Sequence, residues 1–304
     1  MALVHRRTFM AASVATVVAP HLARAQAAVA DNWSTMTRQA RDAAYNSGAA
    51  VSGSTQIVES WVAASATLRS QRPQHIDLAY GSGERNKWDV FPGANPSAPC
   101  LVFIHGGYWQ ARNREHFSCF AEGVLARGWS AALPGYTLAP AATLTQIVQE
   151  IRSALDWLAA QGRAHGIAGP VIVSGWSAGG HLAALMLDHP SVTAGLAISG
   201  IFELGPIRDT YLNERLKLTD EEMTTLSPLR LPSVGKPLAI TYGTAELPAL
   251  VRNSRHYHAY RALSHCSGPL VPVANANHYT IMETLRAPNG ILTRAAVRLV
   301  EDAA

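Results

Sequence analysis

Residues 171–187 read VIVSGWSAGGHLAALML and contain the signal that decides the fold. The β-branched run at its start predicts a buried strand, and the alanine- and leucine-rich end predicts a helix. Between them, residues 175–179 match G-x-S-x-G, whose glycines permit a tight turn that lifts the serine hydroxyl clear of the sheet. The pattern alone is weak because its residues are common, but the strand-turn-helix context makes it specific. We therefore predict that Ser177 is a nucleophile and not part of a plain glycine-rich turn.

Short apolar strands alternate with helical stretches on both sides of this turn. The predicted strands comprise residues 75–80, 87–91, 100–104, 129–133, 171–174, 194–198, 237–242 and 270–273. The predicted helices comprise residues 116–126, 143–160, 180–187 and 290–301. This alternation is typical of an α/β fold in which a mostly parallel central sheet carries helices on both faces. We expect one catalytic domain over residues 73–304, with the first two strands forming a hairpin around residues 81–83.

Two segments fall outside this alternation. Residues 28–72 mix polar and apolar positions and predict a helical arm or cap, with Trp33, Tyr45 and Trp61 as packing anchors. Residues 203–232 hold few strand signals and predict a mobile or lid-like insertion. The way in which both segments fold over the site sets the depth of any pocket there.

The first 27 residues resemble a bacterial twin-arginine export signal. Arg6 and Arg7 precede an apolar run at residues 11–19 and a small-residue stretch, ARAQA, at residues 23–27. This order of charged, apolar and A-x-A segments is typical of a signal that is cleaved, here after residue 25 or 27. The alternative is an ordinary amphipathic N-terminal helix. The signal predicts export in a folded state, to a periplasmic or secreted location.

Composition excludes several classes of protein. Hydrophobic residues make up 48% and charged residues 15% of the chain, which fits a large folded core and not a disordered protein. The formal net charge is +4, but the expected signal carries three arginines and no acidic residue, so its removal leaves about +1. No Lys/Arg stripe is interleaved with aromatic residues, and no stretch is long and apolar enough to span a membrane. We therefore expect neither a nucleic-acid partner nor stable membrane insertion, and the oligomeric state stays open.

A metal site and a disulfide framework are also not expected. The chain has 12 histidines but no H-E-x-x-H motif and no tight Cys/His cluster. Its cysteines, Cys100, Cys119 and Cys266, are scattered and odd in number, so we expect small core hydrophobes. One disulfide in an oxidising compartment remains an alternative whose pairing the sequence does not assign.

Residues 105–109, HGGYW, follow the predicted strand 100–104 and are candidates for an oxyanion hole. In folds with this serine turn, backbone N–H groups of such a loop join that of the residue after the serine. Glycines there permit a close approach of the backbone to a carbonyl oxygen. The predicted donors are Gly106, Gly107, Tyr108 and Ala178. We expect His105 to stabilise the loop, because the general base of such folds follows the serine in the chain.

Two tryptophans flank these motifs, and both are candidates for substrate binding. Trp109 ends the loop, and Trp176 precedes the serine. We expect them to form an aromatic wall of the acyl or leaving-group pocket, with plain core packing as the alternative for each.

A nucleophilic serine needs a base, and the base needs an acid to orient it. The chain order in folds with this serine turn is serine, acid, histidine. Residues 243–246, GTAE, follow a predicted strand and place Glu246 as the acid; the rivals Asp209 and Glu214 lie in the lid-like insertion. His278 follows the last predicted strand and is the predicted base. The other late histidines fall in or just after a helical stretch and are expected on the surface: His256, His258 and His265.

These motifs together resemble the kynurenine formamidase-like (arylformamidase-like) branch of the α/β-hydrolases, which neighbours the hormone-sensitive-lipase-like esterases. The matching segments are residues 105–109 (HGGYW), 136–140 (YTLAP), 175–182 (GWSAGGHL), 199–204 (SGIFEL), 211–213 (YLN), 227–229 (SPL) and 243–246 (GTAE). The resemblance covers roughly residues 75–300 and implies an α/β-hydrolase fold with Ser177, Glu246 and His278 as a catalytic triad. Two features depart from the family. Trp176 stands where the family often has histidine, and an export signal does not suit the cytosolic tryptophan degradation that kynurenine formamidases serve.

Three functions are compatible with these residues. The first is a serine carboxylesterase that cleaves small carboxylic esters, aromatic ones included, through an acyl-enzyme and without a metal or organic cofactor. The second is an arylformamidase that uses the same triad on N-formylkynurenine-like amides. The third is a non-catalytic binding protein on a hydrolase scaffold, which the complete predicted triad disfavours. The two departures from the family favour the ester reading, with a small-molecule ester or amide as the partner.

Overall fold

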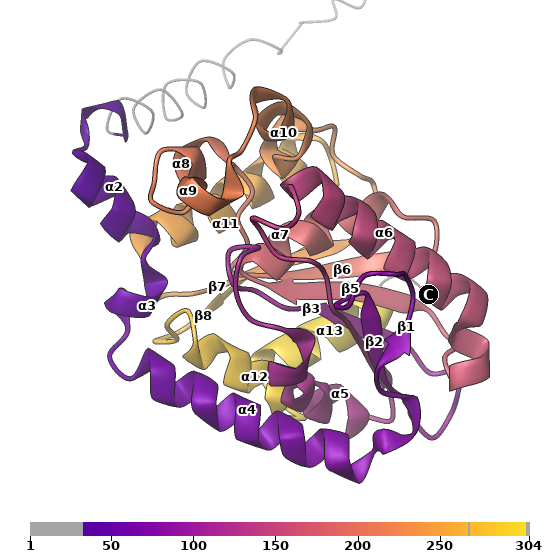
Figure 1. Ribbon diagram of the computed structural model, residues 1–304. Coiled ribbons are helices and arrows are strands. Elements are labelled where there is room, and N and C mark those ends of the chain that lie inside the picture. The colour runs from indigo at the N-terminus through magenta and orange to yellow at the C-terminus, as the bar shows by residue number, and fades with distance from the viewer. Residues whose placement is uncertain (1–32, 267, 302–304) are drawn as a thin grey trace, which may run out of the picture.

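The computed structural model describes residues 33–266 and 268–301, and an eight-stranded sheet forms its centre (Figure 1). The strand order is β1-β2-β4-β3-β5-β6-β7-β8. The strands are β1 Leu78–Ala79, β2 Lys87–Phe91, β3 Cys100–Ile104, β4 Ser130–Pro134, β5 Val171–Trp176, β6 Val192–Ile198, β7 Leu238–Gly243 and β8 Leu270–Val273. β2 runs antiparallel to both β1 and β4, and the remaining neighbours are parallel. The predicted α/β fold with a mostly parallel sheet is confirmed.

The inner strands of the sheet are buried on both faces, because they alternate their side chains between two hydrophobic cores. In β3, Val102 and Ile104 belong to one core, whereas Leu101 and Phe103 belong to the other. All four side chains have almost no exposed surface. This explains why the strand reads as a continuous apolar run and not as an alternating one.

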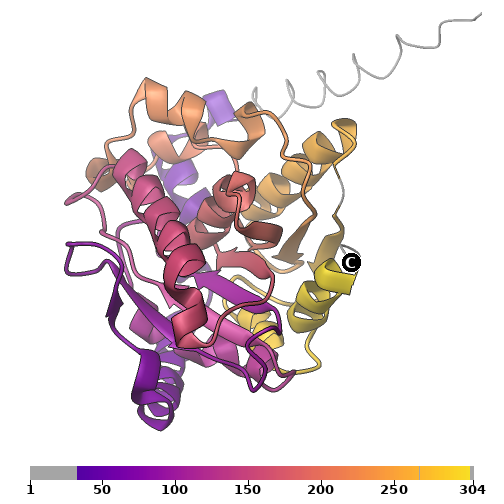
Figure 2. The same ribbon diagram turned by 90° about the vertical axis from the view of Figure 1, so that its right-hand side faces the viewer.

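Helices cover both faces of the sheet, as Figures 1 and 2 show from two directions. The longer helices that supply the first core are α2 Arg38–Tyr45, α6 Leu144–Gln161, α7 Ala178–Leu185 and α11 Pro248–Leu263. The helices that supply the second core are α4 Ser54–Gln71, α5 Glu122–Leu125, α12 Glu283–Arg286 and α13 Ile291–Glu301. The amphipathic period at residues 143–160 therefore predicts α6 within one residue at each end.

Two predicted elements differ from the observed ones. The predicted strand 75–80 is only the two-residue β1, because Pro73–His75 form a 3-10 turn instead. The predicted helix 116–126 is broken into two 3-10 turns, Arg114–His116 and Ser118–Ala121, followed by α5. The 3-10 geometry brings residues three apart into line, which lets Phe117 and Phe120 enter the same core.

The N-terminal segment 33–72 is an integral layer of the fold. It forms α2, α3 (Ser47–Ala50) and α4. Trp61 on α4 is fully buried, and its indole N–H donates to Glu283 Oε1 at 2.7 Å. Its ring lies edge-on to that of Trp176, with 5.6 Å between the ring centroids. The arm therefore reaches the residue that precedes the predicted nucleophile.

The insertion 203–232 contains helices and turns and no strand. It forms α8 (Gly205–Arg208), α9 (Asn213–Leu216), α10 (Asp220–Thr225) and a 3-10 turn, Pro228–Arg230. It is bonded to the arm, since the indole N–H of Trp33 donates to Asp209 at 2.9 Å and the N–H of Tyr211 donates to Asp42 at 2.7 Å. The insertion and the arm thus form one cover over the carboxyl end of the sheet.

The predicted export signal, residues 1–27, lies outside the described residues. In the part of the chain that the structure describes, no helix is long and apolar enough to cross a membrane. Cys100, Cys119 and Cys266 are free thiols; the first two are buried in the core as expected, whereas Cys266 is only half-buried and is not a core residue. Burial raises the pKa of Cys100 to about 12 and that of Cys119 to about 11, as expected of core residues.

Replacing Trp61 tests whether the arm is part of the core. We expect Trp61→Ala to lower the free energy of unfolding by about 3–5 kcal/mol, because it removes a fully buried indole from several aromatic neighbours. Val62→Ala on the same helix is the control, since Val62 is exposed, and should change it by less than about 0.5 kcal/mol. Urea denaturation measures both, and similar losses in the two variants would contradict this role of the arm.

Candidate active site

Ser177 lies on the sharp turn between β5 and α7. Its φ of 57° and ψ of −118° form a backbone conformation that is strained for a residue with a side chain. The strand side is held by its N–H, which donates to the carbonyl of Ile198 at 2.8 Å, and the helix side by its carbonyl, which accepts from His181 N–H at 3.1 Å. A Cβ on Gly175 would clash with the carbonyl of Gly179, so the turn closes only with glycine there. The structure therefore contains the predicted strand-turn-helix.

Glu246 and His278 form a buried pair at the ends of β7 and β8. His278 Nδ1 lies 2.9 Å from Glu246 Oε2. The other carboxylate oxygen accepts from Ser199 Oγ at 2.5 Å and from the N–H of Gly243 at 2.6 Å. Because both oxygens have donors, the carboxylate orientation is fixed, and a neutral His278 carries its proton on Nδ1. Nε2 is then the ring nitrogen that can accept a proton.

Ser177 and His278 open onto one cavity of about 440 Å³. Its walls come from the arm, from the loop after β3, from the serine turn, from the insertion and from the loop after β8. The lining residues are Asn46, Ser47, Gly48, Gly107, Tyr108, Gln110, Ala111, Arg112, Trp176, Ser177, Tyr211, Leu212, Glu214, Arg215, His278 and Tyr279. The structure thus brings the predicted nucleophile and base together although they lie far apart in the chain.

The HGGYW loop runs directly beside the serine turn. A Cβ on Gly106 would lie 2.7 Å from the carbonyl oxygen of Trp176 and 3.1 Å from Ser177 Cβ. Gly107 and Tyr108 have positive φ values of 118° and 49°. Within residues 33–266 and 268–301, the backbone N–H groups of Gly107, Tyr108 and Ala178 donate to no protein acceptor. The predicted oxyanion loop therefore lies beside the nucleophile, and its backbone N–H groups are available to a substrate oxygen.

The two tryptophans differ in position. Trp176 lines the cavity, its ring centroid lies 4.9 Å from that of His278, and its indole N–H donates to the carbonyl of His278 at 2.8 Å. Trp109 does not line the cavity. Its side chain is fully buried and packs edge-on against His181, with 5.0 Å between ring centroids. The prediction that Trp109 forms the pocket wall is thus wrong, and the alternative of plain core packing describes its position.

The rival acids have other partners. Asp209 accepts from Trp33 and pairs with Arg41, and the exposed Glu214 pairs with Arg38. Of the late histidines, two lie on α11 and one just after it, and none of the three lines the cavity: His256, His258 and His265.

Two other buried histidines, His105 and His181, pack within the core. His105 stacks on Tyr136 with 4.2 Å between ring centroids, and its Nδ1 lies 2.8 Å from the carbonyl of Gly106. Burial lowers the pKa of His105 to about 3 and that of His181 to about 4. Both rings are therefore neutral near pH 7, and His105 packs within the loop that it begins.

Other residues of the site have no predicted role in it, although Ser199 and Tyr211 stand in the family-like segments 199–204 and 211–213. The arm contributes residues 46–48, and the insertion contributes Tyr211 and Arg215. Ser199, which holds Glu246, stands in the segment 199–204 and has a positive φ of 49°. Among the described residues, no group of three or more His, Cys, Asp or Glu side chains is arranged to hold a metal ion.

A glycine substitution tests the geometry of the oxyanion loop. Gly107→Ala combines a positive φ with a clash between the new Cβ and the carbonyl of Ala111, so we expect a loss of about 3 kcal/mol or more in unfolding free energy. Gly128→Ala is the matched control, because Gly128 also has a positive φ but open space at the Cβ position, and it should lose only about 1–2 kcal/mol. Equal losses in urea denaturation would show that the loop is not crowded.

Known proteins are similar to this chain in sequence and in fold. A family model described as BD-FAE matches residues 90–191. The kynurenine formamidase of Salmo salar is 30% identical over 74% of this chain and 81% of its own length, and that of Danio rerio is 27% identical over 76% and 84%.

Solved structures of other proteins are similar to this chain in fold. A Silicibacter protein provisionally described as a thioesterase has a TM-score of 0.74 and 29% identity, covering 84% of this chain and 98% of that one. Esterase B of Lactobacillus rhamnosis has a TM-score of 0.64 at 18% identity, covering 82% and 95%, which shows a shared fold. The chain is a hydrolase, and it belongs to the kynurenine formamidase family of the α/β-hydrolases.

Proposed function

We propose that this protein is a serine hydrolase that cleaves small carboxylic esters through an acyl-enzyme on Ser177. The observation that carries the proposal is the 2.9 Å hydrogen bond between Glu246 and His278, in a pair whose imidazole shares one cavity with the serine. A serine on a strained turn, a base in the same cavity and an acid that orients the base are the three parts that acyl transfer needs.

The first half of the reaction forms the acyl-enzyme. Ser177 Oγ attacks the ester carbonyl carbon while His278 Nε2 takes the hydroxyl proton. The oxyanion of the tetrahedral intermediate accepts from the backbone N–H groups of Gly107, Tyr108 and Ala178, and Gly106 supplies the close approach. His278 then gives its proton to the alcohol oxygen as the ester C–O bond breaks, and the alcohol leaves.

The second half returns the free enzyme. Water attacks the acyl carbonyl while His278 takes its proton, and the same N–H groups hold the second oxyanion. Collapse breaks the bond to Ser177 Oγ, which regains a proton from His278, and the carboxylic acid leaves. Glu246 stabilises the positively charged imidazole in both halves, and Ser199 keeps the carboxylate in place. No step requires a metal or an organic cofactor.

A second candidate function uses the same residues on an amide. The relatives named kynurenine formamidase in Salmo salar and Danio rerio favour an arylformamidase that removes a formyl group from an N-formylkynurenine-like aromatic amine. The departure at Trp176 favours the ester, because this large ring lies against His278 and reshapes the floor of the cavity. The predicted export signal points in the same direction, and we propose a periplasmic or secreted location.

A turnover assay with the purified full chain tests this function. We expect p-nitrophenyl acetate and p-nitrophenyl octanoate to have higher kcat/KM values than N-formylkynurenine, and the ratio of the two esters to report the depth of the cavity. Ser177→Ala should lower kcat at least about a thousandfold for every substrate. A preference for N-formylkynurenine by orders of magnitude would favour the second candidate. Equal activity of Ser177→Ala and the wild type would remove the serine from the mechanism.

A further inference from the structure

The cavity that Ser177 and His278 line also carries positive charge that no carboxylate in it balances. Three charged side chains line the cavity besides the catalytic residues: Arg112, Glu214 and Arg215. Glu214 is already paired with Arg38 at 3.5 Å, and Arg215 donates to the carbonyl of Ala139 at 3.2 Å. Within the described part of the chain, the guanidinium of Arg112 makes no hydrogen bond or ion pair. The cavity therefore offers five N–H donors and a positive charge that no protein group uses.

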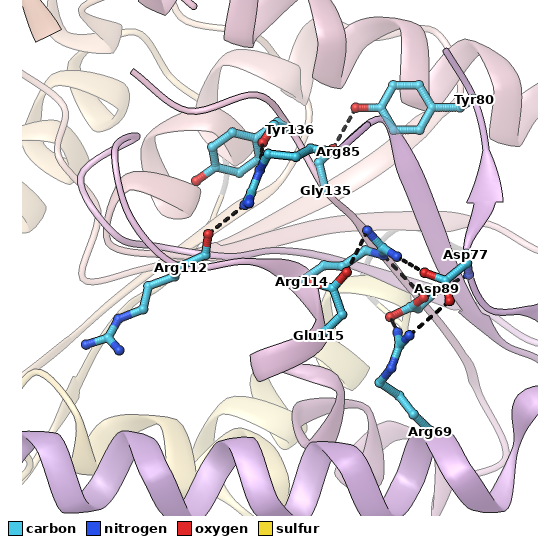
Figure 3. Close-up of polar contacts among 10 residues, drawn as sticks. All are labelled: Arg69, Asp77, Tyr80, Arg85, Asp89, Arg112, Arg114, Glu115, Gly135 and Tyr136. Carbon is cyan, nitrogen blue, oxygen red and sulfur yellow. Dashed lines mark hydrogen bonds and ion pairs between the residues drawn. The ribbon is translucent and has the colours of Figure 1, made fainter. Parts of the chain in front are cut away.

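The backbone of Arg112 is held in place, although its side chain is free. Its φ is 74°, a left-handed conformation that is unfavourable for arginine. Its carbonyl accepts from Arg85 Nη2 at 2.6 Å, and Arg85 Nε donates to the carbonyl of Tyr136 at 2.8 Å. Figure 3 shows the side chain of Arg112 extending away from this bridge. Local strain that the surroundings maintain is typical of functional positions.

Arg114, two residues further along the same loop, has a structural role. Arg114 is almost fully buried and is bonded to Asp77 and Asp89, and Asp89 is also bonded to Arg69 (Figure 3). These contacts neutralise the charge of Arg114 and fix the loop beyond Arg112. The two arginines therefore differ in their partners. Arg114 forms ion pairs with carboxylates, whereas Arg112 lines the cavity without one.

The stem of Arg112 passes beside the oxyanion loop. Its Cγ lies 3.0 Å from the position of a Cβ on Gly107, whose N–H group is one of the proposed oxyanion donors. Arg112, Gly107 and Ser177 line the same cavity, so the guanidinium and the proposed oxyanion donor face one substrate-sized space. The planar fork of the guanidinium matches a carboxylate through two parallel N–H···O bonds, a geometry that a lysine does not reproduce.

We propose that Arg112, assisted by Arg215, binds a carboxylate group of the substrate, so that the enzyme prefers anionic esters to neutral ones. This inference rests on the proposed ester hydrolysis. It adds a specificity-determining residue to that function and narrows the substrate to a carboxylic ester with a second, ionised carboxyl group.

Matched ester pairs test the inference in the full chain. Mono-4-nitrophenyl succinate against 4-nitrophenyl butyrate places the carboxylate on the acyl side, and 3-acetoxybenzoate against phenyl acetate places it on the alcohol side. The quantity compared is the ratio of kcat/KM for the anionic ester to that for its neutral partner. We expect Arg112→Gln to lower this ratio about tenfold for one of the pairs, which corresponds to the loss of a charge-assisted hydrogen bond.

Two further variants control for charge and folding. Arg112→Lys keeps the charge but not the fork, so it should retain part of the ratio and hold it above that of Arg112→Gln. Arg163→Gln removes the same charge from an exposed turn that precedes β5, at the opposite end of the sheet, and should leave the ratio unchanged. Raising the salt concentration from 50 mM to 0.5 M should lower the wild-type ratio, because the group is only partly buried.

The outcomes separate this inference from the proposed function. If Arg112→Gln and Arg112→Lys both leave the two ratios within twofold of the wild type, or if Arg163→Gln lowers them equally, carboxylate binding by Arg112 is wrong while ester hydrolysis stands. If Ser177→Ala hydrolyses all four esters as fast as the wild type, the proposed function itself is wrong. Should Arg112→Gln fail to fold, a salt-independent wild-type ratio and an unchanged ratio in Arg112→Lys still overturn the inference.

Discussion

The buried carboxylate of Glu246 is the contact on which the geometry of the site depends. A charge without exposed side-chain surface is costly unless donors surround it, and here three do: the hydroxyl of Ser199, the N–H of Gly243 and the ring of His278. Ser199 follows β6, and Gly243 ends β7, so the ends of two adjacent parallel strands fix one carboxylate. This arrangement leaves His278 a single orientation, with one nitrogen toward the acid and the other free for the serine.

The N-terminal arm, residues 33–72, also contacts the site. Trp61 lies edge-on to Trp176, and Trp176 both packs against His278 and donates to its carbonyl. Residues 46–48 line the cavity itself. The hydroxyl of Tyr108 in the oxyanion loop donates to the carbonyl of Tyr45 at 2.5 Å. A segment that resembles an appendage in the sequence is therefore part of both the core and the active-site wall.

The sequence predicts the parts of the site that local patterns encode. The serine turn, the loop after β3 and the late acid and histidine each follow a strand, and the carboxyl ends of parallel strands meet at one edge of a sheet. The remaining parts depend on tertiary packing. The burial of Trp109, the breaks near Phe117 and the free guanidinium of Arg112 follow from neighbours distant in the chain, so no local period reveals them.

Covalent labelling tests the central claim that Ser177 is the nucleophile. The full chain is treated with a fluorophosphonate probe, and the site of modification is located by peptide mass spectrometry. The account predicts one adduct per chain on Ser177, formed by attack of Oγ on phosphorus with loss of fluoride, and much slower labelling of Glu246→Gln because the base loses its orienting acid. A protein that hydrolyses esters but carries no adduct on Ser177 would contradict it.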